Sequence, residues 1–365
     1  MSLKAGIVGL PNVGKSTLFN AITKKNILVA NYPFATIEPN VGIVTVPDER
    51  LTKLEEIYIP EELKPATFEF VDIAGIVKGA SLGEGLGNKF LSHIREVDAI
   101  VEVVRCFDDK EITHVDGSVD PTRDVEVINL ELALADLEII NNRIDKIKKK
   151  AETTKEKETV LEYNALTKAK ETLEKDIPLR LADFTKDELL AIKGFNFLTL
   201  KPHIYLANIS ENEITTENDY VKKLKEYAKG ENSKVIVVSA KIESELAELE
   251  DSDKEEMLNE LGIEKSGLDK LIEESYNLLG LKTYFTCGPK EVKAWTYKDG
   301  MNAKECAGII HSDFEKGFIK AEVISYNDLI EAGSELKVKE NGKFRIEGKE
   351  YLMQDGDICH FRFNL

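Results

Sequence analysis

Residues 9–16 read GLPNVGKS, and this short stretch decides the fold. It matches the pattern GxxxxGK[ST] in full. An apolar, strand-like segment precedes it at residues 3–9, and a helical segment follows at residues 15–23. That context is the one in which this pattern binds phosphate, because the glycines let backbone N–H groups and the helix N-terminus face negative charge. The sequence therefore predicts a phosphate loop at the start of an α/β domain.

Three side chains of this loop have predicted roles. Lys15 is expected to reach the β- and γ-phosphates of a purine nucleoside triphosphate, and the Ser16 hydroxyl to coordinate Mg²⁺. Asn12 is a candidate for holding a K⁺ ion that assists charge neutralisation during hydrolysis.

A second motif follows at residues 72–75, which read DIAG at the end of a strand-like segment. Asp72 is expected to hold Mg²⁺ through a water molecule, and the Gly75 amide to sense the γ-phosphate. Thr36 is the natural second hydroxyl ligand of Mg²⁺, with a plain loop threonine as the alternative. The glycine-rich residues 79–87 would form a switch that γ-phosphate orders.

The base is expected to bind where residues 208–211 read NISE, directly after a strand predicted at residues 202–208. A guanine site has the pattern N-K-x-D at this position. In this chain Ile209 replaces the lysine, and Glu211, which is one methylene longer, replaces the aspartate. Unpaired polar groups in a binding site discriminate strongly between substrates, and a carboxylate does not match the edge of adenine. We therefore predict that guanine preference is lost and that Asn208 and backbone groups favour ATP. A displaced but still guanine-specific site is the alternative.

A further base-contacting loop is expected after the strand predicted at residues 235–238. It contains Ser239 and Ala240.

Hydrolysis is predicted to be slow, because Ile76 follows the D-x-x-G motif at a position where a glutamine orients water in Ras-like switches. His114 lies in a polar loop after the strand predicted at residues 99–104 and is a candidate for positioning water. An exposed loop histidine without a catalytic role is the alternative.

The order of segments predicts three parts. Strands alternating with helices indicate a mostly parallel sheet, over residues 1–125 and 201–280. Between them, residues 126–200 contain apolar residues at spacings of three and four, which predict an antiparallel helical hairpin. Residues 281–365 carry short strand-like segments, glycine turns and one helical segment, typical of a small α+β module.

Composition narrows the class of protein. The net charge of −18 argues against sequence-blind or sequence-specific DNA binding, which needs a basic footprint. No apolar run is long enough to cross a bilayer, and the N-terminus does not resemble a signal peptide. Four cysteines without a CxxC pair indicate reduced thiols, so we expect a cytoplasmic protein. Residues 281–365 are nearly neutral, with 13 Lys and Arg against 14 Asp and Glu.

Taken together, several segments resemble the YchF family of Obg-related ATPases over essentially the whole chain. They are GLPNVGKS, NYPFATIEPNVG, VDIAGIVKGAS, GLGNKFLSHIREVDAI, VDPTRDVEVINLELALADL, NISE and VSA. The resemblance implies an ATPase within a GTPase superfamily, with a G domain, an inserted coiled-coil arm and a ubiquitin-like β-grasp module of the TGS type. It also implies ribosome association, and RNA contact through the arm and the C-terminal module.

Residue by residue, the resemblance assigns the phosphates to Asn12, Val13, Gly14, Lys15, Ser16 and Thr17. It assigns Mg²⁺ to Ser16 and Thr36, and the surroundings of adenine to Asn208, Ile209, Ser239 and Ala240. Three functions stay open: an ATP-driven switch on the translation machinery, a guanine-specific ribosome-assembly GTPase, and a nucleotide-gated scaffold with negligible turnover.

Overall fold

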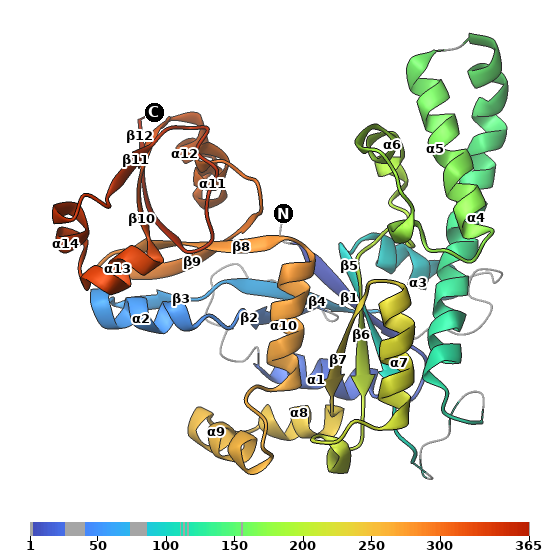
Figure 1. The fold of residues 1–365 in the computed structure, drawn as a ribbon, viewed down its shortest axis with the longest axis horizontal. Helices are drawn as coiled ribbons and strands as arrows, with labels where there is room; N and C mark the ends of the chain where they lie inside the picture. Colours follow the sequence, from blue (N-terminus) through green and yellow to red (C-terminus); the bar gives the residue numbers. More distant parts are fainter. Residues whose placement is uncertain are drawn as a thin grey trace. The chain divides into compact units, whose positions relative to one another are not determined.

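The structure is a computed structural model that describes residues 3–25, 41–73, 86–109, 111, 114, 117–154 and 156–364 (Figure 1). The chain forms two compact units. The first contains Met1–Gly42 and Glu69–Lys270, and the second contains Ile43–Phe68 and Leu271–Leu365.

A six-stranded sheet with the order β2-β4-β1-β5-β6-β7 carries the predicted phosphate loop. Its strands are β1 (Lys4–Gly9), β2 (Val41–Thr45), β4 (Thr67–Asp72), β5 (Ala99–Arg105), β6 (His203–Asn208) and β7 (Lys234–Val238). The pairs that join β4, β1, β5, β6 and β7 are all parallel. The prediction of a mostly parallel sheet is therefore confirmed.

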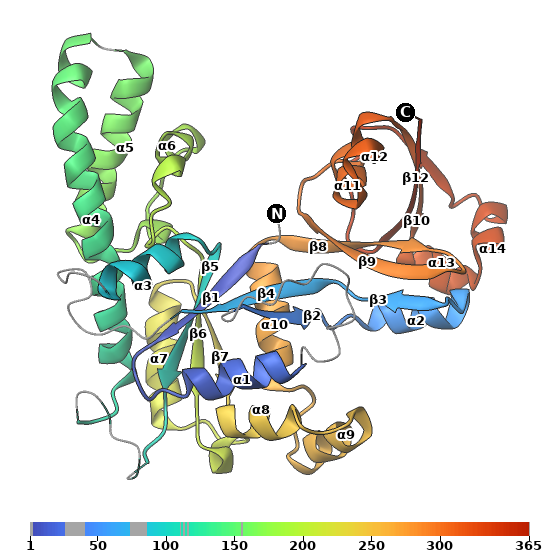
Figure 2. The same ribbon diagram turned by 180° about the vertical axis from the view of Figure 1, so that it is seen from behind.

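Helices cover both faces of this sheet. α7 (Asp219–Gly230) lies in front of the strands in Figure 1, whereas the view from behind in Figure 2 brings α1 (Lys15–Lys25) to the front. Every residue of β5 and β6 is accordingly buried. Strands that are covered on both faces are mostly apolar, as residues 99–104 and 204–207 are, although Glu102, Arg105, His203 and Asn208 are also buried in these two strands. Outside the arm, the first unit also contains α3 (Leu86–Arg95), the short η4 (Glu211–Glu213), α8 (Ala240–Leu246) and α9 (Asp251–Glu260).

The predicted helical hairpin is present as an arm inserted between β5 and β6. It consists of α4 (Pro121–Thr154) and α5 (Lys157–Leu173), followed by η2 (Leu179–Leu181), α6 (Lys186–Ile192) and η3 (Lys193–Phe195). An apolar cluster holds α4 and α5 together, with Ile140, Ala165, Leu166 and Ala169 fully buried. The three- and four-residue spacing of the sequence thus marks the face along which the two helices pack.

The second unit contains a mixed six-stranded sheet with the order β11-β10-β12-β8-β9-β3. Its strands are β3 (Glu62–Lys64), β8 (Leu281–Cys287), β9 (Glu291–Lys298), β10 (Phe318–Ser325), β11 (Arg345–Glu347) and β12 (Asp357–Phe363). Its helices are α2 (Glu49–Tyr58), α11 (Ala303–Ile310), α12 (Ser312–Lys316), α13 (Tyr326–Ala332) and α14 (Glu335–Glu340), while α10 (Gly267–Leu278) begins in the first unit and continues into the second. The predicted α+β character of this part is confirmed.

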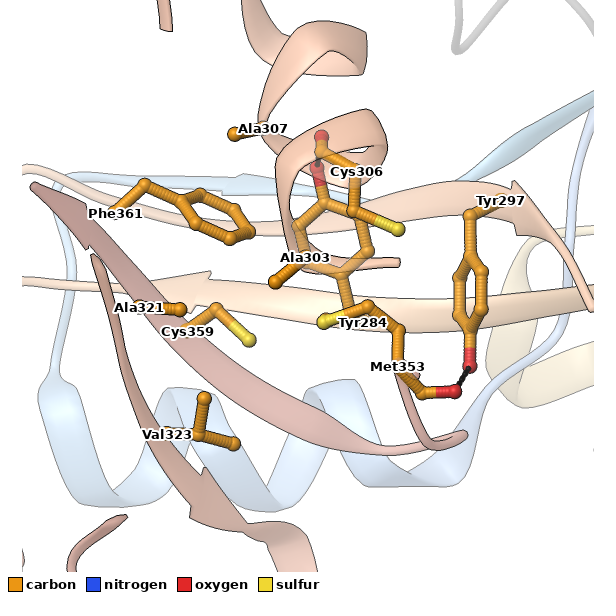
Figure 3. Packing of buried hydrophobic residues seen from close by; sticks show 10 residues of the cluster. All are labelled: Tyr284, Tyr297, Ala303, Cys306, Ala307, Ala321, Val323, Met353, Cys359 and Phe361. Carbon is orange, nitrogen blue, oxygen red and sulfur yellow. Dashed lines mark hydrogen bonds between the residues drawn. The ribbon is translucent and has the colours of Figure 1, made fainter. Parts of the chain in front are cut away.

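The core of the second unit lies between the sheet and α11 (Figure 3). The Tyr284 hydroxyl donates a hydrogen bond to the Cys306 carbonyl of α11 at 2.9 Å, and the Tyr297 hydroxyl donates to the Met353 carbonyl at 3.1 Å. Buried aromatic rings with satisfied hydroxyls combine a large apolar contact with a fixed orientation.

The compact units divide the chain at other positions than the predicted domains. Residues 43–68 were assigned to the nucleotide-binding domain, but they belong to the second unit, where Leu63 of β3 pairs in parallel with Val292 of β9. The arm belongs to the first unit. The three-domain division itself stays a prediction.

Replacing Leu166 by alanine tests the packing of the arm. Leu166 is fully buried, so the truncation should cost about 2–5 kcal/mol of unfolding free energy. Leu190→Ala is the matched control, because Leu190 is 68% exposed and its loss should change stability by less than about 0.5 kcal/mol. Urea unfolding followed by circular dichroism measures both. Equal shifts for the two variants would contradict this account of the arm.

Candidate nucleotide-binding site

The predicted phosphate loop connects the carboxyl end of β1, in the middle of the parallel sheet, to α1. Ligands of open α/β sheets bind at this edge. Leu10 and Val13 anchor the loop in the core, with exposed fractions of 5% and 2%. Asn12 and Gly14 have positive φ angles of 64° and 93°, which turn the chain sharply into the helix. A Cβ atom at Gly14 would lie 2.2 Å from Asn208 Nδ2, so only glycine fits there.

Lys15 and Asp72 come together across the loop. Lys15 occupies the first turn of α1, and Asp72 ends β4, which is the neighbour of β1 in the sheet. The Lys15 ammonium group forms an ion pair with the Asp72 carboxylate. Ser16 and Thr17 are exposed at the N-terminus of the helix. The residues predicted from two separate motifs therefore lie at one edge of the sheet.

Asn208 connects the phosphate loop to the loop after β7. Its side chain is buried, Nδ2 donates to the Val13 carbonyl at 2.8 Å, and Oδ1 accepts from the Ala240 amide at 2.9 Å. An amide nitrogen carries two hydrogens, so Nδ2 retains one donor for a ligand. The sequence analysis predicted a contact to the base and missed this bracing role. The only signal in the sequence is the asparagine directly after a strand.

Ile209 and Glu211 occupy different surroundings. Ile209 is 3% exposed and packs in the apolar cluster that contains Val104 and Ala207. The Glu211 carboxylate forms an ion pair with Lys241 at 2.5 Å, and both side chains are partly exposed. The carboxylate at the fourth position of the NISE segment is thus paired with a cation in the first turn of α8.

Ser239 lies at the N-terminus of α8, beside the Asn208 brace. Its side chain is 1% exposed, and within the described part of the chain its Oγ atom has no hydrogen-bond partner. A buried hydroxyl without a partner costs free energy. The loop that was predicted to contact the base therefore contains a buried hydroxyl without a partner among the described residues.

His114 is held away from solvent. It is 8% exposed, and its Nε2 lies 2.8 Å from Oδ2 of Asp124, which is in the first turn of α4. The histidine is therefore buried and not exposed, and its catalytic role stays a prediction. The carboxylate that holds the imidazole belongs to the first helix of the arm and not to the phosphate loop.

Several predicted positions lie outside the described residues: Thr36, Gly75, Ile76 and residues 79–85. Their roles stay predictions. Among the described residues, no group of three or more His, Cys, Asp or Glu side chains could hold a metal ion. Mg²⁺ bound with a nucleotide keeps several waters and takes few protein ligands. A serine hydroxyl and one carboxylate, as at Ser16 and Asp72, fit that mode of binding.

A parallel sheet with a phosphate loop after its central strand, a lysine in that loop and an acidic residue at the end of the adjacent strand define a P-loop nucleotide-binding protein. None of the helices in the described ranges has the length and apolar character of a membrane span. Comparisons with known proteins narrow this class.

A family model described as a 50S ribosome-binding GTPase matches residues 4–165, and the model for the C-terminal part of YchF GTPases, described as a protein of unknown function, matches residues 281–364. The Ribosome-binding ATPase YchF of Bacillus subtilis (strain 168) is 60% identical over 367 residues, and that of Pasteurella multocida (strain Pm70) is 54% identical over 365. In both comparisons all of each chain is covered. The solved structure of the Schizosaccharomyces pombe YchF GTPase is 43% identical with a TM-score of 0.91, covering 99% of this chain and 98% of that one.

The chain belongs to the YchF family.

Replacing Asn208 by alanine tests the brace. The change leaves the Val13 carbonyl and the Ala240 amide without their partner and frees the loop next to Gly14. Two lost buried hydrogen bonds should weaken nucleotide binding by about tenfold or more. Titration with a fluorescent nucleotide measures the effect. Asn212→Ala, at an exposed position of the same segment, is the matched control, and the brace is refuted if both variants bind like the parent.

Proposed function

We propose that this protein is a slow ATPase that acts as a switch on ribosomes. The observation that carries the proposal is the meeting of Lys15 with Asp72 at the carboxyl edge of the sheet, beside a phosphate loop braced by Asn208. The relatives from Bacillus subtilis and Pasteurella multocida are named ribosome-binding ATPases and match over the whole chain.

In this proposal the triphosphate lies along the backbone amides of residues 12–17. Lys15 would exchange its ion pair with Asp72 for the β- and γ-phosphates, and Asp72 would hold Mg²⁺ through a water molecule. The hydroxyl groups of Ser16 and Thr36 would be ligands of Mg²⁺, and the Gly75 amide would donate a hydrogen bond to the γ-phosphate. Mg²⁺, when bound, neutralises charge that develops on the phosphate oxygens. Asn12 is the proposed contact of a K⁺ ion.

Base selection rests on the pairing of Glu211. In a guanine site a carboxylate accepts hydrogen bonds from the base, but here Lys241 already neutralises the carboxylate of Glu211. Adenine instead meets the remaining Nδ2 hydrogen of Asn208, the Ser239 hydroxyl and backbone groups of Ile209 and Ala240. We infer a preference for ATP. The names of the relatives differ on this point, since the yeast structure and one family model are called GTPases, and a guanine-specific enzyme is the second candidate.

Competition between nucleotides tests the proposal. Unlabelled ATP should displace a fluorescent ATP analogue at about tenfold lower concentration than GTP. The reason is that the hydrogen-bonding edge of guanine does not match the polar groups of the proposed base site. Lys15→Ala should weaken ATP binding by more than about tenfold, because it removes a charged contact to the phosphates. Lys24→Ala removes an exposed lysine of the same helix and is the matched control. Stronger displacement by GTP would establish the guanine-specific alternative.

The place of action follows from the family. We propose a cytoplasmic protein that binds a ribosome or a ribosomal subunit, with RNA contacts through the arm of residues 126–200 and the C-terminal module of residues 281–365. The near-neutral charge of that module supports this, because most of the net charge of −18 lies elsewhere in the chain. The γ-phosphate would act on the switch segments, which precede α3 in sequence. A scaffold with negligible turnover is the remaining alternative.

Replacing His114 by alanine tests its catalytic role. The imidazole must leave Asp124 to reach the attacking water, so it acts only in the stimulated state. Loss of a positioning group should lower ribosome-stimulated turnover by about a hundredfold and leave ATP affinity unchanged. His311→Ala, at an exposed histidine of the second unit, is the control. Unaltered stimulated turnover would remove His114 from the mechanism, and a matching loss of thermal stability would assign it a structural role.

A further inference from the structure

The root of the arm contains a cavity that the nucleotide site does not use. Its volume is about 510 Å³, within the range of ligand-binding cavities. It lies between the first turns of α4, the chain after α5 and the end of α7, which packs against α4. Its wall consists of Glu126, Asn129, Leu130, Ala133, Asp176, Ile177, Pro178, Thr199, Tyr227 and Glu231.

The wall of this cavity is acidic. It contains three carboxylates, and none of its ten residues, all of which the structure describes, is a lysine or arginine. Glu231 is balanced by Arg180, whose guanidinium lies 2.5 Å from Oε2, and the Tyr205 hydroxyl donates to the same oxygen at 2.6 Å. Glu126 and Asp176 are exposed, and they add two negative charges at the cavity that have no ion pair with any described residue.

Glu231 also retains hydrogen-bonding capacity toward the cavity. Its second oxygen, Oε1, accepts a long bond of 3.5 Å from Asn129 Nδ2, and Asn129 donates to the Tyr227 hydroxyl at 3.2 Å. A carboxylate offers about four acceptor positions. A donor that enters the cavity therefore meets a fixed carboxylate, whose orientation is set by Arg180 and Tyr205.

The same wall carries exposed apolar surface. Leu130 is 50% exposed, Ile177 is 40% exposed, and the Tyr227 ring is half-buried. Leu134, one turn further along α4, is 37% exposed, so the apolar strip continues from the cavity onto the arm. Long cationic side chains lie along apolar surface with their charged ends on acidic groups, and they stack on aromatic rings.

We propose that this cavity receives an arginine or lysine side chain from a basic segment of a partner protein, whose apolar residues cover Leu130 and Leu134. Charge complementarity favours this occupant, since Glu126 and Asp176 at the root of the arm repel phosphates there and attract a cation, which leaves the rest of the arm for the proposed RNA contacts. The strip beyond the cavity gives a polypeptide more contact area than a small polyamine would use. This protein contact is separate from the nucleotide site and goes beyond the proposed ATPase function.

Binding of a fluorescein-labelled peptide of Arg-Leu-Gly repeats tests the proposal by anisotropy. The double variant Glu126→Lys, Asp176→Lys should weaken binding by about tenfold or more, because it reverses the charge at the cavity. Glu158→Lys, Glu171→Lys is the matched control, with the same change of net charge at exposed positions of α5, and it should bind like the parent. Leu130→Ala should weaken binding several-fold.

Three outcomes overturn the proposal. Equal weakening by both double variants would mean a general attraction to an acidic protein. Equal binding of a peptide with citrulline in place of arginine would mean that charge is not recognised, and displacement by spermidine at matched charge concentration would assign the cavity to a small cation. Lys15→Ala should leave peptide binding unchanged, so that failure here and failure of the nucleotide-site proposal are distinguishable.

Discussion

The side-chain amide of Asn208 bonds at one end to the Val13 carbonyl and at the other to the Ala240 amide. These bonds join the loop between β1 and α1, the end of β6 and the start of α8. Without these bonds, each segment would be positioned only by the strand to which it is joined. Phosphate binding by backbone amides requires donors that are already aimed at the ligand, because ordering them at the moment of binding would cost conformational entropy. A single buried amide thus links three segments at this edge of the sheet.

Local patterns allowed much of this arrangement to be predicted. The loop at residues 9–16 and the helical arm have short-range signatures, namely glycine spacing and apolar periodicity, and the structure contains both. The brace has none, because Asn208 and Val13 are 195 residues apart in the chain. The same reason explains why the sequence does not indicate that residues 43–68 belong to the same compact unit as residues 271–365. The pairing of Leu63 with Val292 is a long-range contact, and neither segment contains a sequence pattern that predicts it.

His114 shows a different limit of prediction. A histidine among polar residues reads as exposed, yet Asp124 lies ten positions further on and buries it at the start of α4. A second pair, Glu102 and His203, lies on adjacent strands with its atoms 2.9 Å apart and is fully enclosed. Burial raises the pKa of Glu102 and lowers the pKa of His203, so both groups favour their uncharged forms. A neutral pair avoids the cost of two charges in the core of the sheet.

The net charge alone does not indicate which ligands this molecule binds, because the electrostatic field at each site is set by nearby charges. Salt screens interactions between exposed charges beyond about 8 Å at physiological ionic strength. At the end of β1, a triphosphate would therefore interact mainly with Lys15 and the amides at the N-terminus of α1. The net charge of −18 is spread over the whole chain, and salt screens most of it. At the root of the arm the local sign is reversed, since Glu126 and Asp176 lie at a cavity without a basic residue in its wall. The same chain thus has one place where a lysine and helix N-terminal amides gather and another where carboxylates without a basic residue gather, so the two places favour ligands of opposite charge.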